Sequence, residues 1–197
     1  MAEEKIKPIR KLYRMLALVF PLAYVFLSKN FVASFVGIVL FIFIVLEILR
    51  NIDPGFNRLL FEKLHFLLKK KERGRVSAST LFLVSAFVTV FVFEKNIAIA
   101  ALVFSTVGDG FAEIVGKTYG RHRLLGNKTI EGSAAFFLSA FFFGLIVMAM
   151  TGIDLKLMLI GAAAATLTEL VTQKIDDNLV IPVVEGLVKT LFVNFVF

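Results

Sequence analysis

A short segment near the middle of the chain, residues 108–133, concentrates the residue types that could carry out chemistry. It holds three carboxylates, five basic or titratable side chains and six glycines between two strongly apolar stretches. Carboxylates beside clustered cations indicate chemistry on phosphates, because acids bind a metal ion while basic groups bind phosphate oxygens. Ionisable residues in or beside apolar spans are costly, so this concentration favours a functional site.

The acids of this segment have helical spacing. Asp109 lies between Gly108 and Gly110, and Glu113 follows one turn later on the same helix face. The flanking glycines permit either close helix packing or a break that lets the carboxylate approach a ligand. Carboxylates suit Mg²⁺ or another divalent cation, which proteins hold with one or two acids and the substrate's phosphates. The segment therefore predicts a metal–nucleotide site.

The basic residues of the segment follow two glycines. Gly116 and Gly120 precede Arg121 and Arg123, so backbone amides and guanidinium groups would face phosphate oxygens. Neither a Walker pattern nor a preceding strand is present, so no P-loop or dinucleotide fold is predicted.

A second polar group opens the next apolar stretch, where Lys128 and Thr129 are followed by Glu131. Either Thr129 or Asn127 caps the helix that starts here. Glu131 either compensates the helix dipole or takes part in the chemistry.

Further acids lie towards the C-terminus. Glu169, Thr172 and Asp176 have the spacing of one helix face and would line the same cavity, with Asp177 next to them. Glu185 and Lys189, four residues apart, are predicted to neutralise each other.

Composition identifies an integral membrane protein. Of 197 residues, 58% are hydrophobic and 23 are phenylalanine, and several runs approach the roughly 20 apolar residues that cross a bilayer. With no cysteine and two histidines, thiolate and histidine-rich metal sites are excluded. The net charge of +7 lies in short loops between apolar runs, so nucleic-acid binding is not predicted.

We predict an all-α, polytopic bundle of about seven transmembrane helices that forms a single membrane domain over residues 1–197. The predicted spans are Leu12–Leu27, Phe31–Leu49, Val76–Phe93, Ile97–Tyr119, Glu131–Met150, Leu155–Ile175 and Leu179–Phe197. Residues 1–14, 50–75 and 117–130 hold 17 of the 22 Lys and Arg residues, which predicts a cytoplasmic N-terminus. Because successive spans cross the membrane in opposite directions, this orientation places the acidic residues of the candidate site in the cytoplasmic half of the membrane. Around residues 55–72 the pattern predicts an amphipathic helix on the cytoplasmic membrane surface.

The order and spacing of these pieces resemble the CTP-dependent lipid-alcohol kinases, which include dolichol, phytol and CTP-dependent diacylglycerol kinases. The resemblance runs from about Glu47 to the C-terminus. Its motifs are Glu47-x-x-Arg50, Glu72, Gly108-Asp109-x-x-Ala112-x-x-x-Gly116-x-x-x-Gly120-Arg121, Lys128-Thr129-x-Glu131-Gly132-Ser133, and Glu169 followed by Asp176-Asp177-Asn178-Leu179-x-Ile181-Pro182.

The resemblance implies transfer of the γ-phosphate of CTP to the hydroxyl of a membrane lipid alcohol at the cytosolic face, with a divalent cation. It implies that Asp109, with Asp176 or Asp177, binds the metal, and that Glu131 or Glu169 orients or deprotonates the hydroxyl. The nucleotide would be bound by Gly116, Lys117, Gly120, Arg121, Arg123, Lys128 and Thr129. Glu47, Arg50, Glu113 and Asn178 complete the predicted site.

Two alternatives remain. A CDP-lipid cytidylyltransferase shares the pattern around Asp109 and Lys128, although its terminal Asp-Arg-x-Asp segment is missing here. A transporter or channel would also carry intramembrane acids, but the sequence has no visible inverted repeat and its acids cluster on one side.

Overall fold

The computed structural model describes residues 17–63, 76–172 and 176–196. Apart from an isolated β-bridge between Arg123 and Thr129, the regular secondary structure of these ranges is α-helical, as predicted. The helices are α2 (Val19–Phe26), α3 (Lys29–Ile52), α4 (Pro54–Lys63), α5 (Ala78–Val92), α6 (Lys95–Tyr119), α7 (Ile130–Thr151), α8 (Leu155–Val171) and α9 (Asp177–Val196).

Four of these helices, α3, α6, α7 and α9, are long and apolar enough to cross a membrane. The predicted integral membrane bundle is supported, whereas the count of seven spans stays a prediction. Two of the predicted spans are shorter as helices, with 15 residues in α5 and 17 in α8. For the span predicted over Leu12–Leu27, the described residues form only α2, and residues 12–16 lie outside the described ranges.

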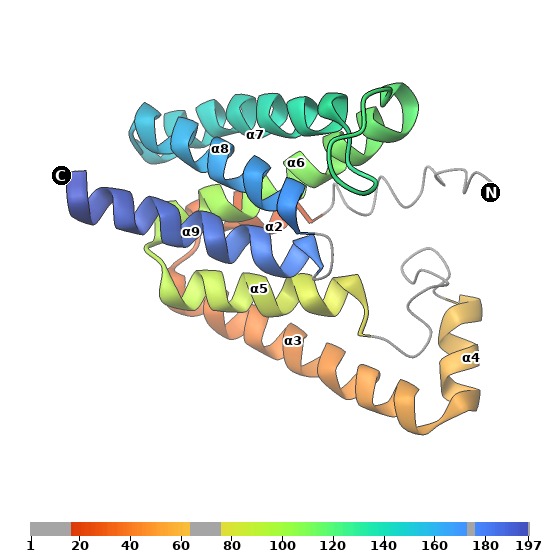
Figure 1. Cartoon of the computed structure of the whole chain (residues 1–197). Helices are drawn as coiled ribbons and strands as arrows, with labels where there is room; N and C mark the ends of the chain where they lie inside the picture. The colour runs from red at the N-terminus through yellow and green to blue at the C-terminus, as the bar shows by residue number, and fades with distance from the viewer. Residues whose placement is uncertain (1–16, 64–75, 173–175, 197) are drawn as a thin grey trace.

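Short turns join neighbouring helices at one end of the bundle (Figure 1). Side chains also hold this end together, because Lys29 Nζ donates to the Phe93 carbonyl at 2.8 Å and Lys95 Nζ donates to the Val25 carbonyl at 2.9 Å. The longer connections lie at the opposite end, on the right of Figure 1. The helices joined by these short turns therefore run in opposite directions, as the turn lengths predict.

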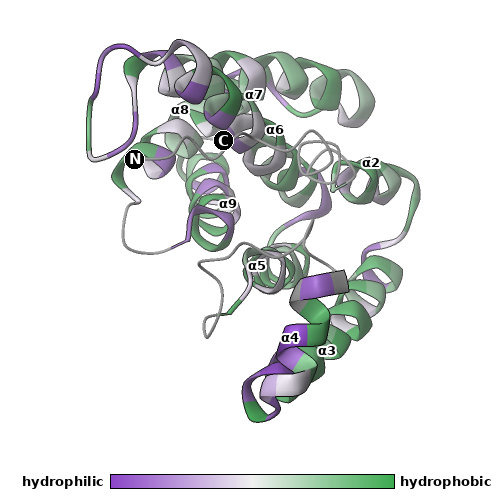
Figure 2. Ribbon diagram, turned by 90° about the vertical axis from the view of Figure 1, so that its right-hand side faces the viewer, coloured by the Kyte–Doolittle hydropathy of each residue, from purple (hydrophilic) through white to green (hydrophobic). Residues whose placement is uncertain are grey.

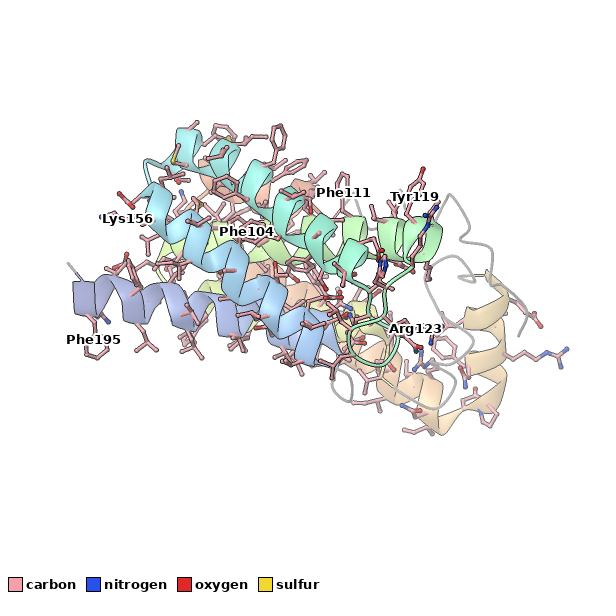
Figure 3. The ribbon with its side chains drawn as sticks, turned by 45° about the horizontal axis from the view of Figure 1, so that its top comes forward. Phe104, Phe111, Tyr119, Arg123, Lys156 and Phe195 are labelled. Atoms are coloured by element: carbon pink, nitrogen blue, oxygen red, sulfur yellow. The ribbon has the colours of Figure 1, made fainter. Side chains whose placement is uncertain are left out.

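Helix α6 forms the centre of the bundle and packs against α2, α5, α7, α8 and α9. Every residue from Ile97 to Ser105 is buried, and three of them are alanines whose small side chains let neighbouring helices approach closely. Phe104, which Figure 3 labels in the interior, is completely buried. The second half of α6 extends from this core to the end of the bundle with the longer loops (Figure 1).

The outer helices expose large apolar side chains. Figure 2 shows mainly hydrophobic colouring along α3, and two of its phenylalanines, Phe35 and Phe41, are 53% and 67% exposed. Helix α7 likewise exposes Leu138 and Phe142. Contiguous apolar surface of this extent is rare on soluble monomers and normal against lipid. The surface therefore supports an integral membrane protein independently of helix length.

Helix α4 begins after a sharp change of direction at Asp53, whose Oδ1 accepts a hydrogen bond from the Gly55 amide at 2.7 Å. Pro54 occupies the first helical position, where its missing amide proton costs no hydrogen bond. The amphipathic helix predicted over residues 55–72 corresponds to α4 as far as Lys63, and residues 64–72 lie outside the described ranges. Its place on the cytoplasmic surface stays a prediction.

Candidate active site

The residues predicted to form the site come from several helices that meet at the end of the bundle with the longer loops (Figure 1). They lie near the ends of α3, α6 and α8, at the starts of α7 and α9, and in the loop 120–129. Figure 3 labels Tyr119 and Arg123 at this end, and Lys156 and Phe195 towards the opposite one. The structure therefore gathers the predicted residues at one end of the bundle, while their functional roles remain predictions.

Lys128 is the centre of this region. Its Nζ donates to Glu169 Oε1 in a short ion pair and lies 3.3 Å from Asp177 Oδ2. Glu169 is almost completely buried, with 3% of its side chain exposed. Its second oxygen, Oε2, has no hydrogen-bond partner among the described residues. One lysine therefore joins the loop before α7 to the end of α8 and the start of α9.

Neighbouring carboxylates stabilise the positive charge of Lys128. Burial lowers the pKa of its ammonium group, but the hydrogen bond to Glu169 and the negative charges of Asp177, Glu169 and Asp109 outweigh burial and raise that pKa above its ordinary value. Asp109 is thus close enough to act on Lys128 electrostatically. We refer to Lys128, Asp109, Glu169 and Asp177 as the Lys128 cluster.

The Lys128 cluster suits a divalent cation that arrives with a phosphate ligand. Three carboxylates face one ammonium group, and carboxylate oxygens are ligands that Mg²⁺ prefers. Within the described residues, no group of three or more His, Asp or Glu side chains is close enough to hold a metal by itself. Where one or two carboxylates bind magnesium, substrate phosphates and water provide the other ligands.

Asp109 lies on an unbroken helix. Of the two arrangements that its flanking glycines permit, the structure has close packing, since a Cβ atom on Gly108 would lie 2.7 Å from Phe136 Cδ1. A Cβ atom on Gly110 would meet nothing within 4 Å. Asp109 also lines a pocket of about 350 Å³ together with Asn178. Glu113, one turn further on, instead forms an ion pair with Lys117 at 2.5 Å.

The loop 120–129 is a compact turn closed by the start of α7. Thr129 is the N-cap, and its Oγ1 accepts a hydrogen bond from the Gly132 amide at 3.1 Å, so of the two predicted caps the structure uses Thr129. Gly126 has φ +56°, a conformation that favours glycine. Arg121 and Arg123 are exposed on this loop. They are accessible to a phosphate ligand.

Glu131 has a different environment from Glu169. It accepts hydrogen bonds from His122, at 2.7 Å from Nδ1 and 3.3 Å from the backbone amide, and it thereby fixes the loop against the first turn of α7. No contact joins it to Lys128 among the described interactions. Of the two acids predicted to act on the lipid hydroxyl, Glu169 therefore lies in the Lys128 cluster and Glu131 holds the loop.

Gly116 and Gly120 were predicted to approach phosphates, and in the structure they pack against the start of α7. A Cβ atom on Gly116 would lie 3.2 Å from Thr129 Oγ1 and 3.6 Å from Gly132 Cα. A Cβ atom on Gly120 would lie 2.8 Å from Thr129 Cγ2. The absence of side chains here permits close contact between α6 and α7.

The predicted continuous face of Glu169, Thr172 and Asp176 is wrong. Helix α8 ends at Val171, and Thr172 has an extended backbone, so the helical spacing does not reach Asp176. Asp176 instead accepts hydrogen bonds from the amide and side chain of Asn178, at 3.1 and 2.7 Å, and orders the start of α9. Asp177 is the acid of this pair that contacts Lys128.

Glu47 and Arg50 form a buried ion pair at the end of α3. Arg50 Nη2 lies 2.8 Å from Glu47 Oε2, and Glu47 Oε1 accepts from the Ser77 amide and from Thr80 Oγ1. Sequence reasoning did not single out Ser77 and Thr80. Their signal is a Ser-x-x-Thr pattern before an apolar run, which is typical of a helix start. The hydrogen bonds from Ser77 and Thr80 to Glu47 fix α3 against the start of α5.

Comparisons with known proteins agree with the sequence resemblance. A probable chloroplastic phytol kinase of Glycine max is 38% identical over 119 residues, which cover 53% of this chain and 40% of that protein. A CTP-dependent diacylglycerol kinase of Eremothecium gossypii is 27% identical over 176 residues, covering 77% of this chain and 56% of that protein. Over the matched residues, the chain is similar in sequence to these lipid kinases. The resemblance to the CTP-dependent lipid kinases is confirmed.

The chain spans about half the length of these two lipid kinases. An uncharacterised protein of Rickettsia prowazekii has a similar size, since the match is 27% identical over 190 residues and covers 93% of both chains. No protein-family model and no solved structure matches the chain.

Proposed function

We propose that the protein is a CTP-dependent lipid kinase that transfers the γ-phosphate of CTP to the hydroxyl group of a membrane lipid alcohol. The acceptor classes are polyprenols such as dolichol, phytol or geranylgeraniol, and diacylglycerol. The names of the homologues support this reaction, since one is a CTP-dependent diacylglycerol kinase and others are phytol kinases. The bias of basic residues towards three connecting segments supports a site on the cytoplasmic side of the membrane.

The observation that carries the proposal is the Lys128 cluster, which places a partly buried lysine among carboxylates at the end of the bundle with the longer loops. Phosphoryl transfer requires positioning and charge neutralisation more than covalent chemistry by the protein. A lysine held in a fixed position by Glu169 and Asp177 fulfils the first requirement for a phosphate ligand. Exposed basic residues on the neighbouring loop supply further phosphate contacts.

In this proposal Lys128 contacts the phosphates of CTP, together with Lys117, Arg121 and Arg123. Asp109 and Asp177 would hold the divalent cation, which when bound neutralises charge on the phosphate oxygens. Glu169 orients the lipid hydroxyl and accepts its proton. The hydroxyl oxygen forms the new bond to the γ-phosphorus, the bond from that phosphorus to the bridging β–γ oxygen breaks, and CDP leaves.

Purified protein in lipid nanodiscs, incubated with CTP and geranylgeraniol or dioleoylglycerol, provides the test. Label in the γ-phosphate of CTP should appear in the lipid, and label in the cytidine should appear only in CDP. Transfer of cytidine label to the lipid would instead establish a cytidylyltransferase. Movement of a solute across proteoliposomes without CTP consumption would establish a transporter.

A further inference from the structure

The pocket beside Asp109 is lined mostly by apolar side chains from parts of the chain that are far apart in sequence. Helix α2 packs on α6 and α3 packs on α5, and the pocket lies between these two pairs. Its apolar lining includes Phe20, Phe35, Phe43 and Phe82. Aromatic rings have few rotatable bonds, so they form walls of stable shape. Such a lining suits a hydrocarbon chain.

Three of the polar residues that line the pocket lie towards the site end of the bundle. Ser79 lies in the first turn of α5 and Asn178 in the first turn of α9, while Asp109 lies in the second half of α6. The Asn178 side-chain amide donates to Asp176, which leaves its carbonyl oxygen to accept from a ligand. The pocket therefore combines apolar walls with a polar end, which is the complement of an amphiphile with one polar terminus.

The polar end of the pocket adjoins the Lys128 cluster. Asp109 belongs to both, and Asn178 follows directly after Asp177, whose carboxylate lies 3.3 Å from Lys128 Nζ. A hydroxyl group at this end of the pocket thus faces the Lys128 cluster, which includes Glu169, the proposed proton acceptor.

The volume of the pocket limits its occupant. About 350 Å³ is at the lower end of the roughly 300–1,000 Å³ range of small-molecule sites. This volume suits part of one hydrocarbon chain and is too small for two. Helix α3 lies at the outside of the bundle and exposes much of its apolar surface, so a lipid can reach the pocket from the bilayer.

We infer that this pocket binds the chain of the acceptor and that the acceptor is a single-chain lipid alcohol, with its hydroxyl at the polar end of the pocket and facing the Lys128 cluster. The inference rests on the proposed lipid kinase function. On this inference, the pocket residues of α3 and α5 determine which alcohol is accepted, independently of the residues that bind the nucleotide.

Binding is tested without CTP, by fluorescence. The chain has no tryptophan, so Phe82→Trp introduces a single tryptophan at the pocket wall, and Phe91→Trp introduces one on the same helix at a position that is 67% exposed. A chain-brominated fatty alcohol should quench Phe82→Trp saturably, and geranylgeraniol should reverse the quenching. Quenching of Phe91→Trp should rise without saturation. Equal, non-saturating quenching at both positions would overturn the inference.

Specificity is tested with a matched pair of substitutions on α3. Val39 lines the pocket, whereas Val45 is 38% exposed and does not. Val39→Phe should raise the KM for geranylgeraniol about tenfold or more, with the KM for CTP unchanged, because an added ring occupies the space of the chain. Val45→Phe should match the unmodified protein. An equal effect of both variants, or preference of the unmodified protein for dioleoylglycerol over geranylgeraniol, would contradict the inference.

The two proposals fail in different ways. Saturable quenching of Phe82→Trp without any CTP-dependent phosphorylation would support lipid binding in the pocket and contradict the proposed kinase function. Phosphorylation of alcohols by the unmodified protein, combined with non-saturating quenching of Phe82→Trp, would support the kinase function and contradict lipid binding in the pocket.

Discussion

Lys128 and Glu169 form an ion pair between residues 41 positions apart in the chain, and the glutamate is almost fully buried. The same lysine contacts Asp177 at 3.3 Å, so the pair fixes both the end of α8 and the start of α9. Removing the positive charge would leave a buried carboxylate without its ion-pair partner. The pair is therefore expected to contribute to stability as well as to phosphate binding.

Lys128→Met should lower the free energy of unfolding by about 3 kcal/mol, because breaking a buried ion pair strands the remaining charge. Thermal unfolding in detergent measures the change. Lys156→Met, an exposed lysine at the opposite end, is the control and should have little effect. The double variant Lys128→Met with Glu169→Gln should recover much of the stability but no phosphorylation. A double variant as unstable as Lys128→Met would contradict the stabilising role of the pair.

The pH dependence of this ion pair follows from the raised pKa of Lys128. A lysine whose pKa is raised on folding contributes its full stabilisation below the ordinary value of 10.5, and loses it as the pH rises through the raised value. The stability difference between the unmodified protein and Lys128→Met should therefore stay constant from about pH 7 to about pH 9. A difference that declines across that interval would show that the lysine loses its proton in the folded protein.

Asp109→Asn should reduce CTP-dependent phosphorylation by about 10²–10³-fold, because it removes a charge proposed to hold the metal ion beside the phosphates. Stability should change little, since asparagine has nearly the same shape. Asp154→Asn is a matched control, because Asp154 caps α8 at the opposite end and asparagine caps helices equally well. Unchanged phosphorylation by Asp109→Asn would exclude this residue from the reaction.

Gly108→Ala tests the packing that positions Asp109. The added methyl group would collide with the ring of Phe136, and overpacking of this kind costs about 1–3 kcal/mol. Gly110→Ala, where nothing lies within 4 Å, should leave the unfolding temperature equal or higher. Phe136→Leu combined with Gly108→Ala should restore stability, measured by thermal unfolding. Similar losses for both glycine variants would contradict the assignment of the effect to the Phe136 contact, because alanine favours a helix more than glycine does.

The sequence predicted features that depend on short-range spacing. Thr129 capping α7 and the pairing of Glu185 with Lys189 depend on residues three or four positions apart, where helix geometry determines the contact. The end of α8 was predicted too late, since the acidic residues after it continued the helical spacing although the helix ends at Val171.

Other features require the tertiary arrangement. Gly116 and Gly120 fit both phosphate binding and close helix contact, because each needs a missing side chain, and only the position of Thr129 identifies the contact. The pocket beside Asp109 combines side chains from α2, α3, α5, α6 and α9, so no local pattern indicates it. The sequence also left the ion-pair partner of Lys128 undetermined, because Glu169 and Asp177 lie far from it in the chain.

Glu185 and Lys189 form a completely buried ion pair on α9, away from the Lys128 cluster. Lys189 Nζ lies 4.1 Å from the centre of the Phe104 ring, and Gly161 on α8 leaves space for the lysine chain. The pair therefore fixes α9 against α6 and α8. We predict that its role is structural.

Lys189→Met alone should lower the free energy of unfolding by about 3–5 kcal/mol, because Glu185 would remain buried without its partner. Replacing both residues, with Glu185→Gln and Lys189→Met, should recover most of this loss, since no charge is then left in the core. Thermal unfolding in detergent gives both values, and phosphorylation per folded molecule should be unchanged in the double variant. If the double variant folds normally but loses phosphorylation, the pair acts in the reaction and its assignment to the core is wrong.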